Sequence, residues 1–104
     1  MNRLLTTLLA VVLIGVTAPT QGTATGGLTE FPTGGVRPSD IVAGPDGNLW
    51  FTEPGSSRIG SITPNGAVTG FTQGLSADSW PWGITVGPDG NIWFTEWQAD
   101  QIGR

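Results

Sequence analysis

The sequence predicts an all-β protein made of repeated four-stranded antiparallel units. Residues 41–53 (IVAGPDGNLWFTE) return almost unchanged as residues 84–96 (ITVGPDGNIWFTE), which defines a repeat of 43 residues. Short runs rich in β-branched and aromatic residues alternate with turn signals about every 8–12 residues, and no segment shows the periodicity of an amphipathic helix. A repeat of this length is typical of units that bury their apolar faces by stacking on copies of themselves.

Residues 1–24 are predicted to be a secretory signal peptide. Arg3 precedes an apolar run at 4–16, and small residues follow it up to Ala24, where cleavage is favoured. At about 13 residues this run is shorter than the ~20 that a membrane-spanning helix needs. We therefore expect a secreted protein with no membrane contact after cleavage, and an uncleaved N-terminal anchor is the alternative.

The rest of the chain, 25–104, is predicted to be a partial propeller domain whose strands follow from its turn chemistry. Pro45 suits the second position of a type I turn, and Gly47 supplies the positive φ that ends it. The expected strands are an outer strand at 28–31, which resembles 68–71, then 40–43, 49–53, 58–63 and 67–71, and finally 84–86, 92–96 and 101 onward. These strands give one complete unit at 40–71 and an incomplete one at 83–104.

The second strand of each unit shows how the units stack. Leu49, Trp50 and Phe51 place bulky apolar groups on both alternating faces of the strand, so both faces must be covered. Four-stranded units of about 40–45 residues that stack radially form a β-propeller, which has 4–8 such blades. The sequence therefore predicts about two blades, with Trp50 and Trp93 in the core.

Composition excludes several classes of function. The 104 residues include no cysteine and no histidine. Four arginines and eight acidic residues give a net charge of −4. An acidic surface without lysine disfavours nucleic acid and anionic membranes as partners. About 80 residues without disulfides bury only about 60% of their unfolded surface. We therefore expect contact with the remaining propeller blades, or self-association through open blade edges.

Acidic residues recur at two positions of the repeat. Glu53 and Glu96 end the second strand of each unit, where a hydrogen bond to a neighbouring turn is favoured over acid–base catalysis. Asp46 and Asp89 lie in the tight turn before that strand. A Ca²⁺ loop spreads its oxygen ligands over about 12 residues, so these aspartates do not predict a metal site.

The candidate ligand-binding residues lie where each unit begins its innermost strand. Trp80 and Trp82 flank the proline that leads into this strand in the second unit, and Arg37 and Asp40 hold nearby positions in the first. Innermost strands line the mouth of a propeller channel, where aromatic side chains can stack on a small molecule or a glycan. Packing against neighbouring loops is the alternative for the tryptophans, including Trp97, and a bond to the adjacent serine is the alternative for Asp40.

The amino-acid identities within the repeat are more specific for a family than the length of the repeat. The segments WPWGITVGPDGNIWFTE and RIGSITPNGAVTGF resemble the blades of the virginiamycin B lyase (streptogramin lyase) family, and the resemblance covers residues 28–104. It implies a seven-bladed propeller that opens type B streptogramin rings by elimination. It further implies a histidine base and an Mg²⁺ ion that stabilises the developing charge.

The catalytic positions of that family are not matched here. The catalytic histidines follow the strand-leading proline, and the corresponding residues are Ser39 and Trp82. The carboxylate that precedes this proline falls on Arg37 and Trp80. We therefore predict no catalytic residue, no metal ligand and no cofactor within this chain, and expect a truncated, inactive lyase segment. The alternatives are a non-catalytic extracellular propeller that binds a glycan or peptide through a tryptophan-rich rim, and several copies assembled into one ring.

Overall fold

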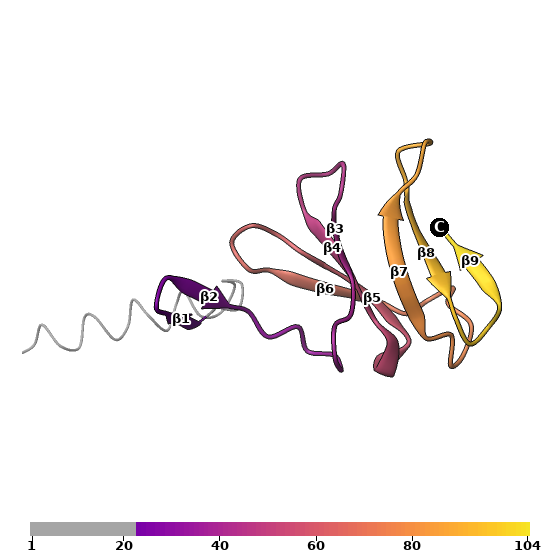
Figure 1. The fold of residues 1–104 in the computed structure, drawn as a ribbon, viewed down its shortest axis with the longest axis horizontal. Helices are drawn as coiled ribbons and strands as arrows, with labels where there is room; N and C mark the ends of the chain where they lie inside the picture. The colour runs from indigo at the N-terminus through magenta and orange to yellow at the C-terminus, as the bar shows by residue number, and fades with distance from the viewer. Residues whose placement is uncertain (1–22) are drawn as a thin grey trace, which may run out of the picture.

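The computed structural model describes residues 23–104, so the signal peptide predicted at 1–24 lies almost wholly outside the described residues (Figure 1). Three antiparallel sheets make up this part of the chain. They are the hairpin β1 (Thr23–Thr25) and β2 (Leu28–Glu30), blade 1 with β3 (Ile41–Ala43), β4 (Leu49–Glu53), β5 (Arg58–Ile62) and β6 (Val68–Phe71), and blade 2 with β7 (Pro81–Val86), β8 (Ile92–Glu96) and β9 (Gln101–Gly103). A short 3₁₀ turn, η1 (Pro54–Ser56), joins β4 to β5.

The all-β class and its four-stranded antiparallel unit are confirmed, with strand order β3-β4-β5-β6 in blade 1. Strands β4 and β8 have the predicted bounds. Strand β7 starts at Pro81, three residues before its predicted start, with a bulge between Pro81 and Ile84. The extension arises because Trp97 N–H bonds to the Trp80 carbonyl at 3.1 Å and prolongs the ladder between β7 and β8.

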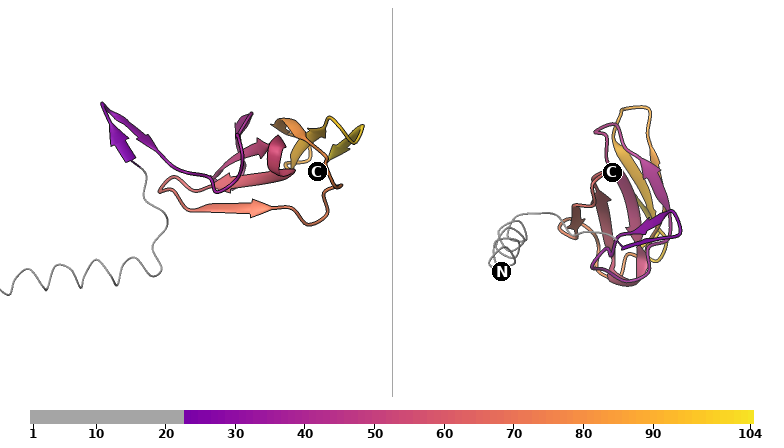
Figure 2. Two further views of the ribbon diagram at one scale, coloured as in Figure 1. Left: turned by 90° about the horizontal axis from the view of Figure 1, so that it is seen from below. Right: turned by 90° about the vertical axis from the view of Figure 1, so that its left-hand side faces the viewer.

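The segment predicted as an outer strand at 28–31 forms β2, but it pairs with β1 rather than with a blade. Thr23 lies opposite Glu30, and Thr25 lies opposite Leu28. This hairpin projects from one end of the molecule, away from the two blades (Figures 1 and 2). No helix within residues 23–104 is long and apolar enough to cross a membrane.

The turn between β3 and β4 has the predicted chemistry. Gly47 N–H bonds to the Gly44 carbonyl at 3.3 Å, which places Pro45 at the second turn position. Gly47 then adopts a φ of 85°, and Gly90 adopts 79° at the same place in blade 2. Such left-handed φ angles favour glycine, so the repeated Pro-Asp-Gly sequence forms the same three-residue hairpin loop twice.

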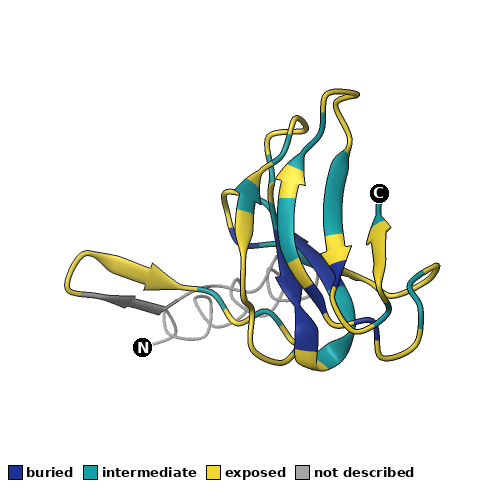
Figure 3. Cartoon of the chain, turned by 45° about the vertical axis from the view of Figure 1, so that its right-hand side comes forward, coloured by how far each residue is buried: buried dark blue, intermediate teal, exposed yellow. Residues whose placement is uncertain are grey.

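The two blades stack through opposite faces (Figure 3). Because side chains alternate along a strand, Trp50 and Thr52 of β4 lie on what we term the forward face of blade 1, with Ile59 opposite Thr52 on β5. This face meets the back face of blade 2, where Ile92 and Phe94 lie. Thr52 is fully buried and Ile59 is 4% exposed, so the described core lies in and around blade 1.

Aromatic rings are accommodated on each blade by glycines on the neighbouring strand. A Cβ atom at Gly60 would lie 2.3 Å from the ring of Phe51, and one at Gly103 would lie 2.3 Å from the ring of Phe94. The absence of side chains at these positions lets each ring lie flat on its sheet. Trp50 and Trp93, both expected in the core, are each only half-buried.

Candidate functional site

The predicted ligand-binding residues Arg37, Asp40, Trp80 and Trp82, here called the inner-strand rim, lie at the start of the innermost strands β3 and β7. Hydrogen bonds between the blades bring two of them together. The Thr52 hydroxyl accepts from Asp40 N–H at 3.1 Å and donates to the Trp82 carbonyl at 2.8 Å. A single buried threonine therefore connects both inner strands of the rim.

Asp40 has a structural function at this junction. One carboxylate oxygen accepts the N–H of Ile41 at 2.9 Å, and the other accepts the N–H of Ile84, on β7 of blade 2, at 3.1 Å. Both oxygens thus bind backbone amides rather than the neighbouring serine. The carboxylate remains exposed, so a ligand in the rim would meet an acceptor that is already oriented.

The rim tryptophans are open to solvent. Trp82 is 53% exposed, Trp80 is 37% exposed, and Trp97, which bonds to the Trp80 carbonyl, is 70% exposed. Large apolar side chains at such exposure offer stacking area for a flat ligand. Trp97 was not included among the predicted site residues, and its place directly after Glu96 at the end of β8 was the only signal for it.

The backbone of the rim is strained at equivalent positions of both blades. Arg37 has a φ of 54° and Trp80 has a φ of 49°, and each precedes a proline. A residue other than glycine rarely adopts this left-handed region, and a following proline restricts it further. Such strain persists only where surrounding contacts impose it, and it is frequent at binding sites.

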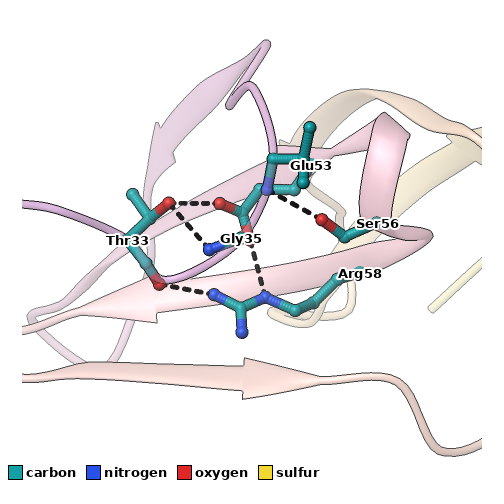
Figure 4. A network of polar contacts seen from close by, with 6 residues as sticks. Thr33, Gly35, Glu53, Ser56 and Arg58 are labelled. Atoms are coloured by element: carbon teal, nitrogen blue, oxygen red, sulfur yellow. Dashed lines mark hydrogen bonds and ion pairs between the residues drawn. The ribbon is translucent and has the colours of Figure 1, made fainter.

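A buried ion pair holds the segment that leads to Arg37 (Figure 4). Glu53 is fully buried, and its Oε1 accepts the Arg58 Nε–H at 2.6 Å. Its other oxygen accepts the hydroxyl of Thr33, whose carbonyl accepts from Arg58 Nη2 at 2.6 Å. A Cβ at Gly35 would lie 2.2 Å from Glu53 Oε1. Glu53 therefore binds a neighbouring connection, in accord with the structural interpretation of this residue.

Blade 2 repeats this arrangement without the arginine. Gln101 stands opposite Glu96 as Arg58 stands opposite Glu53, and Ser76 Oγ lies 3.1 Å from Gln101 Oε1. Glu96 is 6% exposed, and its Oε1 has no hydrogen-bond partner among the described residues. It lines a cavity of about 670 Å³ between the two blades, together with Trp50, Phe71 and Phe94.

Asp46 and Asp89 accept hydrogen bonds from tryptophan side chains. The Trp50 indole N–H bonds to Asp46 Oδ1 at 3.1 Å, and the Trp93 indole N–H bonds to Asp89 Oδ1 at 2.7 Å. The indole bond, followed by bonds from Asn48, lowers the pKa of the Asp46 carboxyl below its ordinary value of 3.8. The pKa of Asp89 is lowered for the same reason, first by Trp93 and then by Asn91.

Residues 23–104 contain no cluster of three or more histidine, cysteine, aspartate or glutamate side chains that could hold a metal ion. The Mg²⁺ donor set that the resemblance implies therefore does not fit these residues. What the described part of the chain offers chemically is an exposed aromatic rim with one oriented carboxylate.

Comparison with known proteins identifies related sequences and folds. A profile of the Virginiamycin B lyase family matches residues 8–104. Virginiamycin B lyases of Bordetella parapertussis and Bordetella bronchiseptica are 44% and 46% identical over 48 residues, which is 42% of this chain and 15% of each relative.

Two crystal structures of Staphylococcus aureus virginiamycin B lyase superpose on the described fold. A catalytically inactive histidine-to-alanine variant with quinupristin has a TM-score of 0.65 and 39% identity, covering 73% of this chain and 26% of that one. The selenomethionine-substituted enzyme has a TM-score of 0.66 and 37% identity, covering 78% and 28%. The chain thus spans roughly a quarter of these structures and less of the curated relatives.

Replacing Arg58 with methionine should destabilise the fold by about 3–5 kcal/mol, because it leaves the fully buried Glu53 carboxylate without its cation. Urea unfolding followed by tryptophan fluorescence measures the loss. The matched control is Arg104→Met, since the Arg104–Asp89 pair at 3.2 Å is solvent-exposed and should matter far less. Glu53→Gln combined with Arg58→Met should recover part of the stability. Equal losses for Arg58→Met and Arg104→Met would contradict this assignment.

Asp46 and Asp89 should titrate below 3.8 in the folded protein. Because their folded pKa values are lowered, the stability they contribute is present above that value and is lost as the pH falls through the folded pKa values. NMR titration of the carboxyl carbons measures this directly. Trp50→Phe should raise the pKa of Asp46 alone, and Trp93→Phe should raise that of Asp89 alone. Unchanged titration in both variants would show that the indole bonds are not the cause.

Proposed function

Because this chain belongs to the Virginiamycin B lyase family, we propose that it supplies propeller blades of a secreted streptogramin B lyase-like protein. The family match over residues 8–104 is the observation that carries the proposal. The superposition on the Staphylococcus aureus structures supports it, since these include a complex with quinupristin. The reaction class is elimination at the ester that closes a type B streptogramin ring.

Elimination breaks the ester C–O bond while a base removes the adjacent α-proton. A double bond and a free carboxylate form, and no water is added. The step needs a base matched to the working pH and a group that stabilises the developing enolate charge. The carboxylates of Asp40, Asp46, Glu53 and Asp89 all accept hydrogen bonds within the fold. The chain contains no histidine that could be this base, so we assign these two blades a scaffolding and substrate-contacting role.

The chain should need other blades to catalyse the reaction. The Staphylococcus aureus variant that carries alanine in place of a histidine is catalytically inactive, and this chain contains no histidine. The rim residues Trp80 and Trp82 would contact the substrate at the channel mouth. Thr52 and Asp40 would hold the two inner strands at fixed separation beneath them.

A second candidate function is ligand binding without catalysis. The exposure of Trp80, Trp82 and Trp97 favours it, because such side chains stack on sugars as readily as on a flat antibiotic. Strain at Trp80 is consistent with either function. The two candidates differ in the ligand class that the inner-strand rim prefers.

The chain alone should not open quinupristin. A chimera of the Staphylococcus aureus enzyme, in which residues 28–104 replace the aligned blades, should open it, because the essential histidine then comes from the host. Elimination leaves the mass unchanged, so chromatography combined with NMR detection of the new double bond measures turnover, while hydrolysis would add the mass of water. Ring opening by the isolated chain, or a folded but inactive chimera, would overturn the proposal.

Trp82→Ala should abolish quenching of tryptophan fluorescence by quinupristin, because Trp82 is the more exposed of the two tryptophans that flank Pro81 at the start of β7. Trp93→Phe, on the opposite side of blade 2 from blade 1, serves as the matched control and should bind as the parent does. Chitohexaose is the competing probe. Tighter binding of chitohexaose than of quinupristin would favour the glycan-binding candidate over the lyase-like one.

A further inference from the structure

Glu96, at the end of β8, is a buried carboxylate that the proposed function does not use. Its side chain is 6% exposed, and its Oε1 has no hydrogen-bond partner among residues 23–104. It lines the cavity of about 670 Å³ between the forward face of blade 1 and the back face of blade 2. Because a buried carboxylate is costly unless it is paired, its place in a cavity indicates a ligand site.

Blade 1 shows which group satisfies the equivalent carboxylate. There the Arg58 guanidinium donates to Glu53 Oε1 at 2.6 Å, and the Thr33 hydroxyl donates to the other oxygen (Figure 4). The counterparts of the two donors, 43 residues further on, are Gln101 and Ser76, and both lie within the described residues. These two side chains contact each other at 3.1 Å instead. Blade 2 therefore keeps the acid of the ion pair but has a neutral side chain in place of the arginine.

The connection that enters blade 2 leaves room beside this acid. It comprises residues 72–79, whereas the connection that enters blade 1 comprises only 32–36. In blade 1 the connection packs so closely that a Cβ atom at Gly35 would lie 2.2 Å from Glu53 Oε1. Asp78, at the equivalent position of blade 2, carries a Cβ and is exposed. The longer connection therefore takes another path and lines the cavity with its first half.

Aromatic rings of both blades line the same cavity. Trp50 and Phe71 of blade 1 are stacked, with ring centroids 5.4 Å apart. Phe94 lies beside the acid, since a Cβ at Gly103 would be 2.3 Å from this ring and 3.1 Å from Glu96 Oε2. Aromatic faces attract cations and also bury flat apolar groups. The cavity thus offers a carboxylate for a charged group and rings for an apolar one.

The charges around the cavity favour a cation. The charged residues that line it are Asp46, Glu96 and Arg104. Arg104 is already paired with Asp89 at 3.2 Å and lies 5.6 Å from the centroid of the Trp93 ring. Its charge is therefore balanced, and the two acids leave the lining negative. A cavity of this volume lies in the range that is usual for small-molecule sites.

We propose that this cavity binds a small organic cation that carries a planar amidinium or guanidinium group. The charged group donates to Glu96 as Arg58 donates to Glu53, and the apolar part of the ligand lies against the aromatic rings. A planar group with parallel N–H donors can bond to both oxygens of a carboxylate, which favours it over an ammonium group. None of the four rim residues lines this cavity, so the inference does not depend on the ligand proposed for the rim.

Benzamidine is the probe for this site, and benzamide is its uncharged isostere. Isothermal titration calorimetry on the full chain should give a dissociation constant for benzamidine on the order of 1 mM or lower. Benzamide should bind at least about tenfold more weakly, because it cannot form a charge-assisted bond to the carboxylate. Equal affinity for the two compounds, or no binding of benzamidine, would overturn the proposal.

Two variants locate the binding at Glu96. Gln101→Arg restores in blade 2 the ion pair of blade 1, so it should weaken benzamidine binding at least about tenfold by occupying the acid. Glu96→Gln should weaken it by a similar factor, because the charge is lost while the shape is kept. Asp78→Asn removes an exposed acid that does not line the cavity, and this matched control should bind as the parent does. Parent-like affinity in Gln101→Arg or in Glu96→Gln would show that the cation binds elsewhere and would refute the inference.

Discussion

The structure depends on a strand that is apolar on both faces. Strand β4 places Phe51 on one side of its sheet and Trp50 on the other, so blade 1 must be covered twice to keep these rings from water. Blade 2 covers one side and leaves the other partly open, which is why Ile41 and Leu49 remain exposed. Because the repeat gives each blade a strand that is apolar on both faces, each blade needs a neighbour on both sides. The need for neighbouring blades is therefore a property of the repeat itself.

Polar groups set the order and spacing of the blades once apolar burial has brought them together. Thr52 and Asp40 bond to backbone atoms of β7, and Glu53 with Arg58 holds the connection that leads into β3. Buried groups such as Thr52 and Glu53 are costly unless they are paired, so they tolerate few alternative arrangements.

The repeat separates residues that build a blade from residues that vary on it. The turn from Gly44 to Asn48 and the strand that follows occur twice with the same contacts, including the bond from tryptophan to aspartate. Arg37 and Trp80 occupy one equivalent position and share its strained backbone, yet their side chains differ completely. Different side chains on the same backbone position allow the blades of a propeller to present different surfaces.

The sequence alone determined the all-β class, the repeat, the turns and the bounds of β4 and β8, because these depend on local φ preferences and on the alternation of side chains. It also led to the family whose profile the chain matches. Only the tertiary structure showed that Asp40 bridges two blades and that β2 pairs with β1. It also showed that Glu53 is ion-paired, while Glu96 has no such partner among residues 23–104. These outcomes depend on groups far apart in sequence meeting in space, and no local pattern encodes such distances.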